Sequence, residues 1–109
     1  MVAMKDVLDL GEKIAQKFQP ERIILYGSHA RGNASDNSDV DLMVILPLKG
    51  HSIHMALEIR KRVHQEFPLD LLVRTPQEFE QRLRDEDWFI REVLAQGKVL
   101  YEAPHDRVD

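Results

Sequence analysis

Cysteine is absent from this chain of 109 residues, so neither a disulfide nor a thiolate metal site can stabilise it. This absence suits a reducing compartment, and we expect the protein to be cytoplasmic. Aromatic residues make up only 6% of the chain, which disfavours a surface that stacks many nucleic-acid bases. Acidic residues outnumber basic ones by 19 to 15, and the net charge of −4 argues against strong, charge-driven binding to nucleic acid or to a membrane surface.

Long apolar runs are lacking as well. Charged residues from Lys5 to Lys13 interrupt the N-terminal segment before it reaches the length of a signal-peptide core, and no membrane span is expected. The 43% hydrophobic and 31% charged residues are typical of a globular protein. At roughly 100–200 residues per domain, we expect one domain, residues 1–103, followed by a flexible tail, residues 104–109.

The hydrophobic pattern predicts helices that alternate with strands. The predicted strands are residues 22–26, 40–46, 69–73 and 98–101, the last as an edge strand, and the predicted helices are 7–18, 53–67, 76–84 and 88–96. The polar stretch 27–38 is expected to be a loop with one helical turn. The residues at helical spacing in the 53–67 helix are Ile53, Ala56, Leu57, Arg60, Val63 and Phe67, with Met55 and Ile59 beside this stripe. Thr75 is predicted to cap the 76–84 helix, with Glu78 completing a capping box. We therefore predict an α+β fold with α/β-like connections: a small mixed β-sheet of three to four strands flanked by helices.

The predicted order of strands and helices brings three acidic residues to one end of the sheet. A right-handed crossover through the 53–67 helix makes the 69–73 strand parallel to the 40–46 strand, so Asp39, Asp41 and Asp70 lie at the same end of the sheet. Asp39 and Asp41 are two residues apart and point to the same face. For the Gly27-Ser28 turn to reach them, the 22–26 strand has to be antiparallel to the other two.

Carboxylates placed together repel, and a divalent cation among them makes the arrangement favourable. Oxygen ligands favour Mg²⁺ or Mn²⁺ over zinc. The 27–31 turn supplies hydrogen-bond donors for phosphate. Gly27 and Ser28 offer backbone N–H groups and a hydroxyl, and the Arg31 guanidinium offers several N–H donors in one plane. Acids for a metal together with donors for phosphate indicate metal-assisted phosphoryl or nucleotidyl transfer.

Each signal also has an ordinary structural interpretation. Asp39 and Asp41 are typical solvated acids at a strand start, Gly27-Ser28 is a typical turn, and an arginine is usually exposed. Asp70 is harder to explain this way, because it interrupts a run of leucines and valines in a strand where burial of a charge is costly unless it is paired.

Together these residues carry a resemblance. The segments Gly27-Ser28-His29-Ala30-Arg31-Gly32 and Ser38-Asp39-Val40-Asp41-Leu42 resemble the signature of the DNA polymerase β-like nucleotidyltransferase superfamily. Within it, the chain is similar to the minimal nucleotidyltransferases, which are often encoded as antitoxins beside HEPN-domain toxins. The paired motifs are specific for the superfamily and much less so for the antitoxin role.

The resemblance implies a role for each matching residue. Gly27 and Ser28 would hold the triphosphate of ATP, and Arg31 would contact phosphate or support the loop. Asp39, Asp41 and Asp70 would be the catalytic residues that bind Mg²⁺ or Mn²⁺, and Asp70 would also help to activate the acceptor hydroxyl. His29 stands outside the motif, and a solvated loop histidine is the expected interpretation.

Several functions stay open at this point. The first is an enzyme that transfers AMP from ATP to a hydroxyl of a HEPN-domain toxin, acting alone or as part of a homo- or hetero-oligomer. The second is a binding module that neutralises a toxin sterically, and the third is a transferase for a small molecule. Trp88, Phe89 and Ile90 exceed what one helix face needs; core packing is the default for them and a partner interface the alternative.

Overall fold

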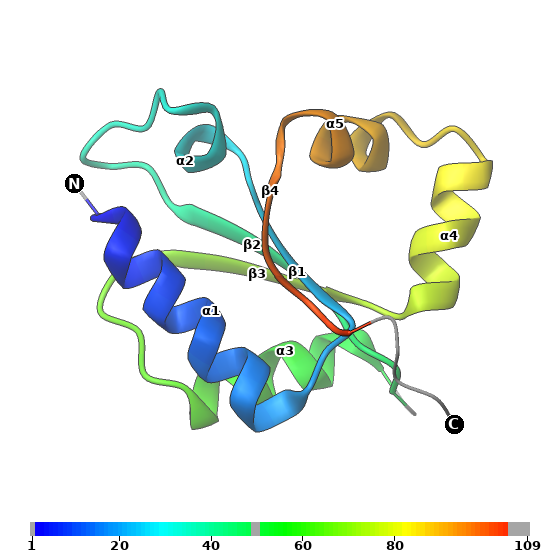
Figure 1. Cartoon of the computed structure of the whole chain (residues 1–109), viewed down its shortest axis with the longest axis horizontal. Helices are drawn as coiled ribbons and strands as arrows, with labels where there is room; N and C mark the ends of the chain where they lie inside the picture. The colour runs from blue at the N-terminus through cyan, green and yellow to red at the C-terminus, as the bar shows by residue number, and fades with distance from the viewer. Residues whose placement is uncertain (1, 49–50, 105–109) are drawn as a thin grey trace.

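The computed structural model describes residues 2–48 and 51–104, which form one four-stranded sheet with helices on both faces (Figure 1). The strands are β1 (Arg22–Tyr26), β2 (Val40–Ile45), β3 (Leu69–Arg74) and β4 (Lys98–Glu102). The helices are α1 (Met4–Phe18), α2 (Ser28–Arg31), α3 (Ser52–Arg62), α4 (Pro76–Arg84) and α5 (Trp88–Gln96). Of the predicted flexible tail, residues 105–109 lie outside the described residues.

The sheet has the strand order β3-β2-β1-β4. The predicted directions are confirmed, because β1 is antiparallel to β2 whereas β2 and β3 are parallel and joined by the α3 crossover. β4 is an edge strand, as predicted, and pairs antiparallel with β1. This mixed sheet with flanking helices confirms the predicted α+β fold class.

Each face of the sheet has its own apolar core. Alternate strand residues such as Leu25, Leu42 and Leu71 pack with α1 and α3 on one face. The other face packs with α4 and α5 through Ile24, Met43 and Phe79, among others. Because strand side chains alternate between faces, the odd and even positions of β2 belong to different cores. Asp41 is in step with Met43 and therefore shares the α5 face of the sheet.

The predicted helix 53–67 was too long. α3 ends at Arg62, and Val63 has extended backbone angles of φ −125° and ψ 117°. Val63 is nevertheless buried in the core, so the chain leaves the helix in order to keep this β-branched side chain inside. The Arg60 guanidinium donates a hydrogen bond to the Leu69 carbonyl, which joins the last turn of α3 to the start of β3.

The predicted apolar stripe of this helix was also wrong in part. Ile53 and Leu57 were expected to face the core, but they are 69% and 53% exposed. Ile59, which was expected beside the stripe, is fully buried, and Met55 packs against the same core. The core-facing side of α3 is therefore rotated relative to the stripe predicted from the full 53–67 segment.

Core packing was the default expectation for Trp88, Phe89 and Ile90 at the start of α5, and it was wrong for the two aromatic residues. Ile90 is buried, whereas Trp88 is 74% and Phe89 37% exposed. Asp87 caps α5 by accepting a hydrogen bond from the Ile90 N–H. Ile90 and Val93 are the α5 side chains that pack in the core on this face of the sheet. None of the helices within 2–48 and 51–104 is both long and apolar enough to cross a membrane.

Candidate active site

The end of β1 and the starts of β2 and β3 meet at one end of the sheet. In the strand register, Tyr26 lies opposite Asp41, and Asp41 lies opposite Asp70. The three side chains therefore project from neighbouring strands onto the same face. Asp39 precedes β2 by one residue and is exposed, so it approaches Asp41 from the loop.

Gly27 brings the β1–α2 turn directly against Asp41. It has φ 76° and ψ −157°, a conformation that L side chains rarely adopt. A Cβ atom at this position would lie 2.1 Å from Oδ2 of Asp41, which no real structure tolerates. Glycine is thus required twice at this turn, for its backbone angles and for its lack of a side chain.

The residues after Gly27 form the short helix α2. Its backbone is closed by hydrogen bonds from the Ala30 and Arg31 N–H groups to the Gly27 carbonyl. Gly32 ends the helix with a left-handed φ of 81°. Ser28, at the start of the helix, is half-buried, and Arg31, at its end, is exposed. The single helical turn predicted within 27–38 is confirmed.

The electrostatics of the site centre on Asp41. Partial burial raises the pKa of the Asp41 carboxyl, and the negative charges of Asp70 and Asp39 raise it further, while His29 and Arg31 oppose the shift. Burial also raises the pKa of the Tyr26 phenol, with Asp41 and Asp70 adding to the effect. These influences place Asp39, Asp70, His29 and Arg31 within electrostatic reach of Asp41.

Asp39, Asp41 and Asp70 are neighbours but do not form a complete metal-binding site. No three His, Asp or Glu side chains in the described part of the chain are gathered closely enough to hold a metal ion as they stand. Asp70 also differs from expectation, because it is exposed on the edge strand β3 instead of buried among leucines.

His29 is the residue that sequence reasoning missed. It was expected to be a solvated loop histidine, but its side chain is buried, with 9% exposure. Its Nε2 lies 3.3 Å from the Ser38 carbonyl oxygen, so the ring ties α2 to the residue just before Asp39. Its place inside the 27–32 segment, directly after Ser28, was the one signal in the sequence that it belongs to the site.

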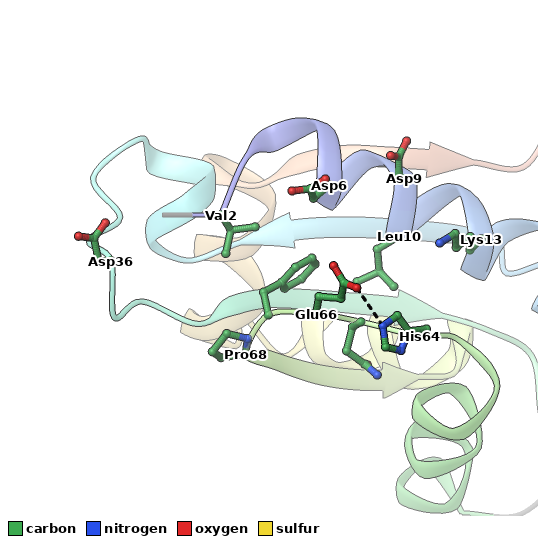
Figure 2. A pocket seen from close by; sticks show the side chains of 11 residues that line it. Val2, Asp6, Asp9, Leu10, Lys13, Asp36, His64, Glu66 and Pro68 are labelled. Carbon is green, nitrogen blue, oxygen red and sulfur yellow. Dashed lines mark hydrogen bonds and ion pairs between the residues drawn. The ribbon is translucent and has the colours of Figure 1, made fainter.

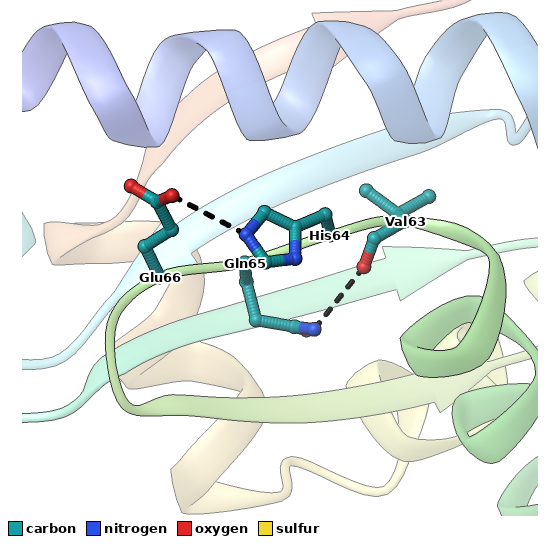
Figure 3. A network of polar contacts seen from close by, with 4 residues as sticks. All are labelled: Val63, His64, Gln65 and Glu66. Atoms are coloured by element: carbon teal, nitrogen blue, oxygen red, sulfur yellow. Dashed lines mark hydrogen bonds and ion pairs between the residues drawn. The ribbon is translucent and has the colours of Figure 1, made fainter.

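A cavity of about 480 Å³ lies beside α1, away from the candidate active site (Figure 2). Its acids, among them Asp6, Asp9 and Asp36, are spread along separate edges of the cavity. The polar contacts beside it are local: His64 Nε2 pairs with Glu66 at 3.3 Å, and Gln65 donates to the Val63 carbonyl (Figure 3). Both members of the His64–Glu66 pair are exposed, so their contact contributes little to stability.

Comparison with known proteins decides the family. A sequence model of the family "Polymerase beta, Nucleotidyltransferase" matches residues 9–106, which is most of the chain. The chain belongs to the polymerase beta nucleotidyltransferase family. The match spans both motifs, so the resemblance noted in the sequence is confirmed at the level of this family. No curated protein sequence gives a significant match.

Solved structures show that this nucleotidyltransferase also shares its fold with distant relatives. A candidate nucleotidyltransferase from Sulfolobus solfataricus is 20% identical, with a TM-score of 0.64 over 91% of this chain and 79% of that one. A toxin-antitoxin crystallised with AMP-PNP is 23% identical, with a TM-score of 0.57 over 91% and 76% of the two chains. A mutant of the toxin-antitoxin MntA-HpeT is 21% identical, with a TM-score of 0.56 over the same shares.

Proposed function

We propose that this nucleotidyltransferase uses a divalent metal ion to transfer AMP from ATP to a hydroxyl group of a protein acceptor. The observation that carries the proposal is the approach of Gly27 to Asp41, with Asp70 in register beside them. A turn of backbone donors and a row of carboxylates thereby share one end of the sheet. This is the pairing that a nucleotide triphosphate and its metal ions require.

The donor set fits Mg²⁺ or Mn²⁺. Asp39, Asp41 and Asp70 would hold the ions, and each offers only hard oxygen ligands. Burial and then the negative charges of Asp70 and Asp39 raise the pKa of Asp41, and an added cation would relieve the repulsion among these three carboxylates. When bound, such ions neutralise the negative charge that develops on the transferring phosphate.

The chain's own residues would position and deprotonate the reactants. Ser28 and the Gly27 turn would hold the triphosphate, and Arg31 would bind its oxygens with a planar pair of donors. The acceptor oxygen then bonds to the α-phosphorus while the bond between the α-phosphorus and the bridging oxygen breaks, and pyrophosphate leaves. The hydroxyl proton passes to Asp70, which is solvent-exposed and can release it to water.

The acceptor we favour is a HEPN-domain toxin. Two structural neighbours are toxin-antitoxin proteins, one crystallised with AMP-PNP. Large apolar side chains also remain exposed on two helices of this chain, Ile53 and Leu57 on α3 and Trp88 and Leu94 on α5, as on surfaces that dock another protein. The pair would form a hetero-oligomer in the cytoplasm, where ATP is available. Steric neutralisation without transfer and transfer to a small molecule are the competing outcomes.

The direct test is transfer of label from ATP labelled at the α-phosphate, with Mg²⁺ or Mn²⁺, to the toxin encoded beside this chain. We expect Asp41→Asn to abolish labelling while the protein stays folded. Asp9→Asn is the matched control, because Asp9 is an exposed acid on α1. This helix packs on the face of the sheet opposite to the one that carries Asp41. Equal labelling by wild type and by folded Asp41→Asn would contradict the proposal.

A further inference from the structure

Among the residues that the structure describes, His29 is the one polar or charged residue that is buried, with 9% exposure. Removing an imidazole from water is costly unless its polar atoms find hydrogen-bond partners. The Nε2 atom of His29 lies 3.3 Å from the carbonyl oxygen of Ser38. Because a carbonyl oxygen can only accept, Nε2 carries the proton and donates this hydrogen bond. The bond joins α2 to the peptide group between Ser38 and Asp39.

Ser38 is also held by the loop to which it belongs. The Ser38 N–H donates to the Ser35 carbonyl at 3.1 Å, and the Ser35 N–H donates to Oγ of Ser38 at 2.9 Å. These two hydrogen bonds close a turn within the connection that leads from α2 to β2 (Figure 1). Both bonds stay inside the loop, whereas the hydrogen bond from His29 connects this turn to α2.

Both peptide groups that flank Asp39 are therefore fixed. On one side, the Ser38 carbonyl accepts the hydrogen bond from His29. On the other side, the Val40 N–H donates to the Pro68 carbonyl at 2.9 Å, where β2 begins to pair with β3. The Asp39 side chain itself is exposed. A carboxylate on an anchored backbone loses less conformational entropy when it binds an ion than a carboxylate on a free loop does.

We propose that His29 is a positioning residue that holds Asp39 in place for a metal ion through the Ser38 carbonyl. The inference rests on the proposed function, in which Asp39 is one of the metal ligands. Loss of a hydrogen bond that orients a metal ligand costs roughly 10- to 100-fold in metal affinity or activity. Binding of the triphosphate should depend much less on His29, because the backbone hydrogen bonds of α2 close this helix onto Gly27 without it.

The direct test is binding of Mn²⁺ to the purified chain without nucleotide, measured from the electron paramagnetic resonance signal of the free ion. His29→Leu keeps an apolar side chain in the buried position but has no donor, and it should weaken Mn²⁺ binding roughly 10- to 100-fold. His29→Gln places an amide N–H near the position of Nε2 and should bind almost as tightly as wild type. His29→Asn has the same amide on a side chain too short to replace Nε2, so its affinity should fall as in His29→Leu.

His64→Leu is the matched control and should bind Mn²⁺ as wild type does. His64 also has an Nε2 contact of 3.3 Å, with Glu66, but it is exposed and lies beside the cavity near α1.

The transfer assay gives a second measurement. His29→Leu should need roughly 10- to 100-fold more metal ion for half-maximal rate, while its KM for ATP at saturating metal stays near that of wild type. Excess Mn²⁺ should restore the rate by mass action. A general loss of structure would instead lower the rate at every metal concentration.

Three results would overturn the inference. Unchanged Mn²⁺ affinity in folded His29→Leu and His29→Asn would show that Asp39 needs no support from His29. An equal loss in His29→Gln and His29→Leu would assign the effect to packing of the ring instead of the hydrogen bond. A wild-type chain that binds no Mn²⁺ would remove the metal site itself. If wild type binds Mn²⁺ but labels no acceptor, the proposed transfer fails, and the Mn²⁺ affinities of the variants still decide the role of His29. If His29→Leu does not fold, His29→Asn and His29→Gln provide the comparison.

Discussion

Gly27 and Gly32 bracket α2, and both have a positive φ, but only Gly27 has a close neighbour. An alanine at either position carries the cost of a left-handed backbone, about 1–2 kcal/mol. At Gly27 the new Cβ must also displace the Asp41 carboxylate, whereas at Gly32 it meets no atom within 4 Å. The two glycines therefore form a natural pair for testing the turn.

We expect Gly27→Ala to abolish nucleotide transfer and to destabilise the protein more than Gly32→Ala, which should retain transfer. Urea unfolding measures the stability of each variant, and the labelled-ATP assay measures its activity. Full activity in Gly27→Ala would show that the close approach of the turn to Asp41 is not needed for the chemistry.

The raised pKa of Asp41 predicts how the stability of the fold depends on pH. Its pKa is raised in the folded protein, so the native state binds the Asp41 proton more tightly than the unfolded chain does. The Asp41 carboxyl thus adds to the free energy of unfolding at low pH, and this contribution is lost as the pH rises through the pKa of Asp41 in the folded protein. At neutral pH the ionised carboxylate opposes folding, and a neutral side chain of the same shape removes this penalty.

Asp41→Asn should therefore raise Tm at pH 7 in the absence of divalent cations. Because the carboxylate is partly exposed to water, the gain should stay below about 1 kcal/mol, or roughly 5 °C for a domain of this size. The gain should vanish below the pKa of an ordinary aspartate. Thermal unfolding from pH 3 to pH 8 tests this, and a difference between the two proteins that is the same at every pH would contradict it.

Among the elements, α4 and α5 decide what surrounds the site. α4 begins with the predicted capping box, in which Thr75 accepts from the Glu78 N–H and Glu78 accepts from the Thr75 N–H. The hydrogen bond from the Thr75 backbone is the main cause of the lowered pKa of Glu78. α4 places Phe79 in the same core as Ile90 of α5, so the cap supports the packing of both helices on this face of the sheet.

Thr75→Ala should lower the free energy of unfolding by about 0.5–2 kcal/mol, the usual cost of a lost N-cap. Thr75→Ser keeps the hydroxyl acceptor and should lose much less. Transfer activity at temperatures well below Tm should stay near wild type, because Thr75 is not part of the site. Equal stabilities of the alanine and serine variants in urea unfolding would show that the capping hydroxyl contributes nothing.

At the scale of the whole molecule, the proposed function requires a surface that contacts a protein acceptor. The negative net charge of the chain disfavours a polynucleotide as the proposed acceptor. Leu94 of α5 and Ile53 of α3 are exposed and offer apolar surface for contact with a protein acceptor. A complex with the acceptor would bury such surface.

Intact-mass measurement of the adjacent toxin after co-expression distinguishes the mechanisms. We expect added mass equal to one or more AMP groups, and loss of toxin activity, with the wild-type chain. The Asp39→Ala/Asp41→Ala chain should leave the toxin unmodified and active. Neutralisation by both chains without added mass would support steric binding instead, and no interaction with the toxin would remove the antitoxin role.

The sequence by itself determined the strands, their directions and the place of the acids. Buried runs ended by glycine or proline define β1 to β3, and the handedness of the crossover is enough to bring Asp41 and Asp70 to the same end. The capping box likewise announces α4, because its hydrogen bonds are local in sequence. These features depend on neighbouring residues or on a general rule of chain topology, so no knowledge of packing was needed.

Only the tertiary structure decided which side chains are covered. α3 ends five residues before the predicted end because Val63 has to enter the core, and His29 is buried because Ser38 and α2 are brought together around it. Trp88 stays exposed because Ile90 and Val93 are the α5 side chains that pack in the core. Burial depends on contacts between residues far apart in the chain, and hydrophobic periodicity alone does not contain them.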